Sequence, residues 1–264
     1  MNQDKIVVVM GGPSTEAEIS RQTGAAILKA LQSKGYNAEG MELNPPTFAE
    51  DIKKSGCAIV FNALHGKFGE DGVLQGTLDM LGIPYTGSGV LAAAVTMDKA
   101  ASKRVFVAEG ISTPRSHTYH RYEMKRDLAA EIEQGFSLPV VVKAASQGSS
   151  IGVYIVETKE ALADALKEAF SYNDEVLIEE FIRGKELTVA VWGNEEKKEA
   201  FPIIEITTAS GRYDYESKYT KGASTHIIPA RVSDEKTKEI QALAIKTFKP
   251  EVRVIGAIPE GSPA

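Results

Sequence analysis

Short apolar runs alternate, in the first part of the chain, with longer segments whose apolar positions recur every three or four residues. Residues 6–10 form a largely β-branched run, which is typical of a strand buried on both faces of a parallel sheet. Residues 16–34 have helical spacing and end at Gly35, a residue that commonly follows a helix. Extended segments at 38–43 and 57–62 continue the alternation. The pattern predicts a small doubly wound α/β domain.

The middle of the chain has the pattern of a second, mixed α/β region. Turn-forming residues concentrate at 81–89 and are expected to close the first domain, and one helix is expected over 90–110. Strands are predicted at 116–119, 140–143, 153–155 and 176–180, with helices at 122–134 and 159–170. An alternating strand begins near Glu186, and we expect its Trp192 to be a core residue. Residues 234–248 have the spacing of an amphipathic helix.

The last segment, residues 250–264, departs from this pattern. It contains three prolines in fifteen residues and no second helical segment. We therefore expect the last domain to be incomplete.

Composition and charge narrow the classes of protein. The chain has 264 residues, of which 43% are hydrophobic and 25% charged, so it is neither disordered nor fibrous. Its 30 basic and 36 acidic residues give a net charge of −6, which argues against a general nucleic-acid binder. Cys57 is the only cysteine, no apolar run is long enough to span a bilayer, and the N-terminus leads directly into a strand. We expect a cytoplasmic protein without nucleic-acid or membrane partners.

Two segments of the first domain carry candidate chemistry. Residues 11–16 follow a strand and open a helix, where backbone N–H groups attract carboxylates and phosphates. The alternative is an ordinary helix cap, with Ser14 as the acceptor and Glu16 favouring the helix dipole. Residues 65–76 combine four glycines with histidine, glutamate and aspartate directly after a strand, where α/β sheets present ligand sites. The alternative there is a surface turn with a hydrogen-bonded His65.

The second region contains a candidate phosphate site. Lys143 ends a buried strand and is followed by the Gly/Ser-rich loop 146–152, which offers backbone and hydroxyl donors beside one cation. The P-loop pattern is absent, and a hairpin beside a lysine with an extended side chain is the alternative. Residues 179–186 fit either an adenine-covering segment or a solvated connection. The polar aromatic stretch 213–219 has the character of an active-site lid.

Taken in order, these segments resemble the D-alanine–D-alanine ligase family of ATP-grasp enzymes. The resemblance runs from about Lys5 to Phe248, and residues 65–76 match the family's first signature at every constrained position. The other matching segments, in family order, are 11–20, 97–99, 143–152, 178–186 and 218–219. The resemblance implies an N-terminal doubly wound parallel-sheet domain that binds substrate over residues 1–95. An ATP-grasp fold of two α+β lobes would follow, a small lobe at 96–183 and an incomplete large lobe at 184–264 with a lid near 211–225.

The activity that the resemblance implies is the ATP-dependent joining of two D-alanines through a D-alanyl phosphate, for peptidoglycan precursor synthesis. The family's nucleotide-binding positions correspond here to Lys99, Lys143, Gly148, Ser149, Glu179, Phe181, Ile182, Glu186 and Lys218. Glu16 would hold the ammonium group of the first D-alanine, with His65 nearby. Ser149 and Tyr219 would complete a hydrogen-bonded set with Glu16, and the catalytic group would be Glu16, Ser149, Lys218 and Tyr219. Tyr219 favours an amine over a hydroxyl acceptor, and the family is usually homodimeric through its N-terminal domain.

The resemblance ends after Lys249. The family continues with strands that carry Arg-x-Asp and Glu-x-Asn, whose carboxylate and amide groups hold two Mg²⁺ (or Mn²⁺) ions, and neither pattern is present. Arg253 and Glu260 lie in the tail without a matching context. We therefore expect a truncated or frame-shifted ligase without its metal ligands. A nucleotide-binding fragment with impaired catalysis and an ATP-grasp ligase acting on a different carboxylate are the alternatives.

Overall fold

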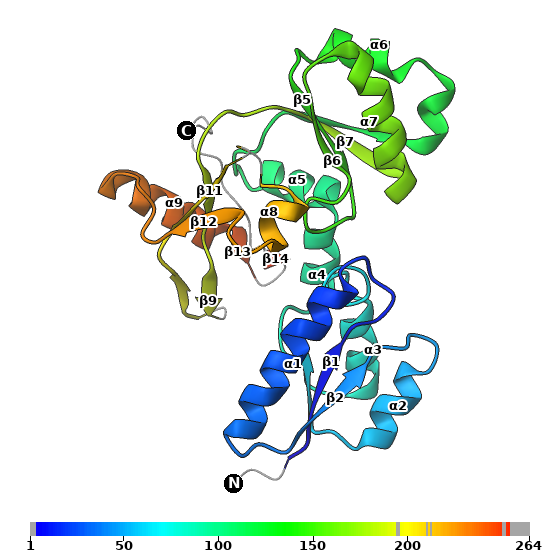
Figure 1. Ribbon diagram of the computed structural model, residues 1–264, viewed down its shortest axis with the longest axis vertical. Coiled ribbons are helices and arrows are strands. Elements are labelled where there is room, and N and C mark those ends of the chain that lie inside the picture. The colour runs from blue at the N-terminus through cyan, green and yellow to red at the C-terminus, as the bar shows by residue number, and fades with distance from the viewer. Residues whose placement is uncertain (1–3, 194–195, 210, 212, 250–251, 254–264) are drawn as a thin grey trace. The chain divides into compact units, whose positions relative to one another are not determined.

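The structure is a computed structural model that describes residues 4–193, 196–209, 211, 213–249 and 252–253 (Figure 1). The chain divides into two compact units, Met1–Met97 and Asp98–Ala264. The predicted boundary between the two ATP-grasp lobes at 183/184 lies within the second unit and stays a prediction. Among the described residues, no helix is both long enough and apolar enough to cross a membrane.

The first unit is a three-stranded parallel sheet with helices on both faces. Its elements are β1 (Ile6–Met10), α1 (Ala17–Ser33), β2 (Ala38–Glu42), α2 (Phe48–Ser55), β3 (Ile59–Asn62), α3 (Val73–Leu81) and α4 (Val90–Met97). The strand order is β2-β1-β3, with Ile6 of β1 opposite both Ala38 and Ile59. Val7 and Val9 pack in one apolar core with residues of α2 and α3, while α1 packs on β1 and β2 (Figure 1). The predicted doubly wound domain is confirmed.

The first part of the second unit is a four-stranded antiparallel sheet. Its elements are α5 (Lys99–Ala108), β4 (Ser116–His120), the 3₁₀ helix η1 (Arg121–Lys125), α6 (Leu128–Gly135), β5 (Val140–Ala144), β6 (Val153–Val156), α7 (Lys159–Tyr172) and β7 (Glu175–Glu180). The strand order is β4-β7-β5-β6, so β5 and β7 lie at the centre. Residues of α6 and α7, among them Ile132 and Phe170, form its core together with Val142 and Ile178.

The second part of this unit contains short antiparallel strands and the 14-residue helix α9. Its elements are β8 (Glu186–Thr188), β9 (Val191–Gly193), β10 (Lys198–Ala200), β11 (Ile204–Thr208), α8 (Tyr215–Tyr219), β12 (Ser224–Ile227), α9 (Asp234–Thr247), β13 (Phe248–Lys249) and β14 (Val252–Arg253). The sheets are β12-β11-β8, β10-β9 and β13-β14. Leu187, Ile203 and Ile240 lie in one apolar core, against which Val191 of β9 and Ala200 of β10 pack. Apart from β14, the predicted atypical tail at 250–264, including Glu260, lies outside the described residues.

Three local expectations are wrong. The segment 90–110 is two helices, because Asp98 has an extended backbone and accepts a hydrogen bond from the Ala101 N–H at 2.8 Å, which starts α5 anew. The segment 122–134 divides in the same way into η1 and α6, with Asp127 as the cap. Trp192 is 73% exposed rather than buried, since Val191 takes the inward position on β9 and packs against the core.

Candidate active site

A glycine turn fixes the start of α1 in the first unit. Gly11 and Gly12 have φ values of +72° and +80°, which L-residues with a side chain rarely adopt. A Cβ atom at Gly11 would lie 2.1 Å from Glu42 Oε1, so a side chain there would displace the Glu42 carboxylate. Glu42 accepts a hydrogen bond from the Gly12 N–H at 3.0 Å and forms a 2.8 Å ion pair with Arg21. The turn is therefore held between β2 and α1.

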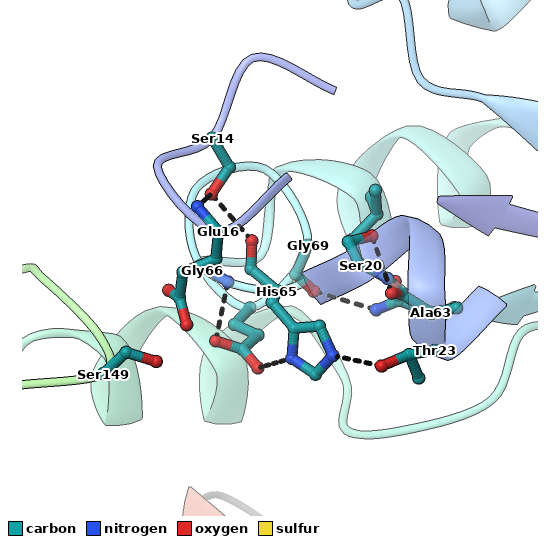
Figure 2. Close-up of polar contacts among 12 residues, drawn as sticks. Ser14, Glu16, Ser20, Thr23, Ala63, His65, Gly66, Gly69 and Ser149 are labelled. Carbon is teal, nitrogen blue, oxygen red and sulfur yellow. Dashed lines mark hydrogen bonds and ion pairs between the residues drawn. The ribbon is translucent and has the colours of Figure 1, made fainter. Parts of the chain in front are cut away.

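The residues that follow this turn join the loop after β3 in one polar cluster (Figure 2). The Ser14 hydroxyl donates to the His65 carbonyl oxygen at 2.9 Å and accepts from the Glu16 N–H at 3.1 Å. Glu16 is 4% exposed, and a Cβ atom at Gly66 would lie 2.6 Å from its Oε2. The missing side chain at Gly66 thus leaves room for the Glu16 carboxylate. The two candidate segments, 11–16 and 65–76, therefore contact each other in one cluster.

His65 is oriented by groups on both sides of its ring. Its Nε2 lies 3.1 Å from Thr23 Oγ1, and its Nδ1 lies 3.6 Å from Glu70 Oε1 (Figure 2). The other oxygen of Glu70 accepts from the Gly66 N–H at 2.8 Å. The Glu70 carboxylate raises the pKa of His65 above its ordinary value, against the opposing effect of partial burial. The Glu70 carboxylate therefore favours the protonated form of the ring.

The second unit gathers lysines around the central strands of its four-stranded sheet. Lys99, at the first position of α5, donates to the carbonyl oxygens of Ala144 at 3.1 Å and Gln147 at 2.5 Å. Burial, together with the nearby positive charge of Lys143, lowers the pKa of Lys99 to about 8. Lys218 acts electrostatically on Lys99 as well and lies 5.2 Å from the centroid of the Tyr213 ring. Two of the three predicted phosphate-binding lysines, Lys143 and Lys218, therefore act on the third, Lys99.

Glu179 on β7 is the counter-charge of this group. It is 5% exposed, and it forms ion pairs with Lys143 through Oε2 and with Lys103 through Oε1, the latter at 2.7 Å. These two lysines lower the pKa of Glu179, although burial alone would raise it. Lys103 lies outside the motifs that predict the site residues. Its spacing of four residues from Lys99 on a helix, which places both on one face, was the available signal.

A cleft of about 550 Å³ lies between the four-stranded sheet and the segment that leads to β8. This volume is in the range of small-molecule sites. Its lining includes four of the predicted nucleotide-binding residues, which are Lys143, Phe181, Ile182 and Glu186. Apolar side chains of β5 and β6, Val141 and Ile155, face them. A cleft with apolar walls and a few charged groups suits a planar base that carries a polar tail.

The predicted lid is tied to the Gly/Ser-rich loop by two hydrogen bonds. The hydroxyls of Ser149 and Tyr219 lie 2.6 Å apart, and the Ser150 hydroxyl donates to the Tyr213 carbonyl oxygen at 3.0 Å. Ser149 and Ser150 have φ values of +51° and +61°, so the loop holds two residues in the left-handed region. Gly148 accepts from the Ile151 N–H at 3.0 Å within the same loop. Asp214 caps the N-terminus of the lid helix α8, because its side chain accepts a hydrogen bond from the Ser217 N–H.

The predicted site residues therefore fall into two groups. Glu16 and His65 belong to the first unit, and all the others belong to the second. The part of the predicted hydrogen-bonded set that joins Ser149 to Tyr219 is present in the second unit. The link of that pair to Glu16 stays a prediction. Among the described residues, no three histidine, cysteine, aspartate or glutamate side chains gather as a metal site.

A parallel α/β unit followed by antiparallel sheets, with a lysine-lined cleft under a Gly/Ser loop and a short lid helix, defines an ATP-grasp protein. Models of the D-ala D-ala ligase N-terminus and C-terminus match residues 38–88 and 105–254. The D-alanine–D-alanine ligase of Pelotomaculum thermopropionicum is 47% identical over 249 residues, which are 93% of this chain and 78% of that protein. The chain belongs to the D-alanine–D-alanine ligase family.

Solved structures have the same fold. The crystal structure of D-alanine–D-alanine ligase from Bacillus anthracis matches with a TM-score of 0.79 and 33% identity, over 94% of this chain and 79% of that one. A structure of the Bacillus anthracis ligase complexed with ATP matches with a TM-score of 0.77 and 31% identity, over 96% and 79% of the two chains. The predicted α/β fold and its resemblance to ATP-grasp ligases are thereby confirmed.

Proposed function

We propose that this protein joins two D-alanine molecules at the expense of ATP, for the synthesis of peptidoglycan precursors. Membership of the ligase family supports the reaction. The cleft lined by Lys143, Phe181 and Glu186 is the observation that supports ATP binding. The carboxylate of the first D-alanine attacks the γ-phosphorus of ATP, and ADP leaves. The amine of the second D-alanine then attacks the carbonyl carbon of the D-alanyl phosphate, loses a proton and expels inorganic phosphate.

The chain's own residues divide between the nucleotide and the amino acids. We propose that Lys99, Lys143 and Lys218 bind phosphate oxygens, since cations are needed where negative charge shifts during phosphoryl transfer. Glu179, Phe181 and Ile182 would surround the adenine, Glu186 would accept from the ribose hydroxyls, and Gly148 and Ser149 would donate to phosphate. Phe181 and Ile182 in the cleft wall support this assignment, whereas Glu179 lies behind the wall in its ion pairs with Lys103 and Lys143.

The first D-alanine would bind at the cluster in the first unit. The buried Glu16 carboxylate suits an ammonium group, and the His65 ring, held between Thr23 and Glu70, belongs to the same cluster. Tyr219 on the lid, bonded to Ser149, would cover the acyl phosphate and exclude water that would hydrolyse it. Mg²⁺ or Mn²⁺ is expected from the family, but the described residues do not form a ligand set for it, so no step here is assigned to a metal ion.

Partners and location complete the proposal. A homodimer fits the first unit, where Val73, Met80, Val90 and Leu91 expose apolar side chains on α3 and on α4, which packs against it. We propose that a second copy of this chain covers them. A cytoplasmic location suits a reaction that consumes ATP, and D-alanine and ATP would be the small-molecule partners.

The proposed reaction is tested by measuring phosphate release with ATP, magnesium chloride and D-alanine. We expect release that depends on D-alanine, with D-alanyl-D-alanine as the product. Lys143→Met should lower kcat/KM by about 100-fold or more, because a donor aimed at developing charge is lost. Lys167→Met, which removes the same charge from an exposed position on α7, should leave it unchanged. ATP binding without D-alanine-dependent phosphate release would instead identify a nucleotide-binding chain that has no ligase activity.

A further inference from the structure

Two lysines share one buried carboxylate in the second unit, and their surroundings differ. Lys103 Nζ contacts Glu179 Oε1 at 2.7 Å, Thr113 Oγ1 at 2.8 Å and the Pro114 carbonyl oxygen at 2.5 Å. An ammonium group has three donors, so every donor of Lys103 has an acceptor in the protein. Lys103 is 8% exposed and is not part of the cleft wall.

Lys143 has the opposite character. Its side chain is 27% exposed and lines the cleft, and its ion pair with Glu179 is its one polar contact among the residues that the structure describes. Two of its three ammonium donors can therefore turn toward a ligand without breaking another bond. Lys103 and Lys143 also repel each other across Glu179, since the three groups together carry two positive charges and one negative charge.

The cost of moving Lys143 depends on what remains at Glu179. A carboxylate that is 5% exposed would be strongly destabilised if its only cation left, because an unpaired buried charge is costly. Lys103 prevents this, because it stays bonded to Oε1 when Oε2 is vacated. The mutual repulsion of the two lysines favours the exchange further.

We propose that Lys103 is a positioning residue that keeps Glu179 charge-compensated, so that Lys143 can move from Glu179 to a phosphate oxygen of the incoming nucleotide. This inference rests on the proposed use of ATP. In it, Lys103 is a cation that stays bonded to Glu179, and Lys143 is a cation that moves to the nucleotide. Lys103 itself does not touch the nucleotide. Without its charge, Lys143 would stay on Glu179 and would bind phosphate poorly.

The inference is tested by isothermal titration calorimetry on the whole chain, with ATP in magnesium chloride as one probe and adenosine as the other. Adenosine has no phosphate, so the proposed contact of Lys143 with a phosphate oxygen contributes nothing to its affinity. We expect Lys103→Gln and Lys103→Met to raise the Kd for ATP by about tenfold or more, in line with the penalty for one buried charge, and to change the Kd for adenosine less than about twofold. Lys125→Gln removes the same charge from an exposed position on η1 and should change neither.

The double variant Lys103→Gln, Glu179→Gln separates charge compensation from a merely structural role. With no carboxylate to compensate, Lys143 is available again, and the ratio of the adenosine Kd to the ATP Kd should return to the wild-type value or exceed it. This holds even if Lys103→Met does not fold, because the double variant removes the charged pair together.

Three results would contradict the inference. They are equal losses of ATP and adenosine affinity in the single variants, no loss of ATP affinity, and a ratio that stays low in the double variant. A wild-type chain that binds neither probe would overturn the proposed function together with this inference, whereas wild-type binding with an unchanged ratio in the variants overturns the inference alone.

Discussion

The pKa of Lys99 is strongly altered by its surroundings. This lysine lies among carbonyl oxygens that it satisfies as a donor, yet burial and the neighbouring Lys143 lower its pKa to about 8. A phosphate needs the protonated form, and the protonated fraction of Lys99 falls as pH rises through 8. The affinity for ATP should therefore decrease between pH 7 and pH 9, which calorimetric titration at fixed ionic strength measures.

Lys99→Arg is the matched variant for this pH dependence. Arginine stays charged throughout this range, so the decrease should become smaller in the variant while binding at pH 7 persists. A decrease of the same size in Lys99→Arg would assign the pH dependence to another group.

The sequence predicts some side chains of the cleft and misses the ion pair behind it. Lys143 and Glu186 line the cleft as their motifs indicate, because each comes directly beside a strand end whose place in the sheet follows from its apolar pattern. The ion pair of Lys103 with Glu179 joins residues that are far apart in the sequence, on a helix and on a strand. Only the packing of α5 against the sheet brings them together, so no local pattern indicates that pair.

Among the helices and strands, the helix caps matter most for the site, because the cap at Asp98 sets the position of Lys99. Asp98 and Asp127 each interrupt a segment whose apolar spacing predicts one continuous helix. The apolar spacing shows which side chains of a helix face the core. It does not reveal a break between two helices when the apolar positions on both sides of the break keep the same spacing. An aspartate that prefers to accept a backbone N–H overrides this spacing, and Lys99 becomes the first residue of α5.

Removing these two caps should have the same effect on stability and different effects on binding. Asp98→Ala and Asp127→Ala should each lower the free energy of unfolding by about 1 kcal/mol, the usual cost of a lost cap. Asp98→Ala alone should weaken ATP binding, because it loosens the turn that carries Lys99. Urea denaturation and ATP titration measure the two effects. Equal losses of ATP affinity in both variants would mean that the cap at Asp98 has no specific part in the site.

For the whole molecule, the strand pattern of the sequence predicts the sheet type in the first unit only. The β-branched run of β1 predicts the parallel sheet of the first unit, whereas no strand pattern in the second unit predicts that β4, β5, β6 and β7 pair antiparallel. The pairing of the short strands β8 to β12 is less accessible, since strands of three to five residues carry little periodic signal. Trp192 illustrates this. Side chains alternate between the two faces of a strand, and Val191, one position earlier, takes the inward place that the pattern predicts for Trp192.

Association of two copies is the prediction that belongs to the whole molecule. Met80 is 90% exposed and Leu91 is 61% exposed, and burial of such side chains in an interface removes apolar surface from water. Met80→Asp and Leu91→Asp should convert a dimer to a monomer in light scattering after size exclusion. Val107→Asp, which places the same charge at an exposed apolar position of the second unit, should leave the mass unchanged. A dimer that tolerates both first-unit changes would place the interface elsewhere.

The outward position of Trp192 also determines how ligand binding can be followed by light. Because this is the only tryptophan in the chain, selective excitation of its indole reports on the β9–β10 hairpin in water rather than on the nucleotide cleft. The chain has nine tyrosines, and Tyr213, Tyr215 and Tyr219 belong to the lid segment. Closure of the lid over a ligand should therefore appear in tyrosine emission while the tryptophan spectrum stays constant.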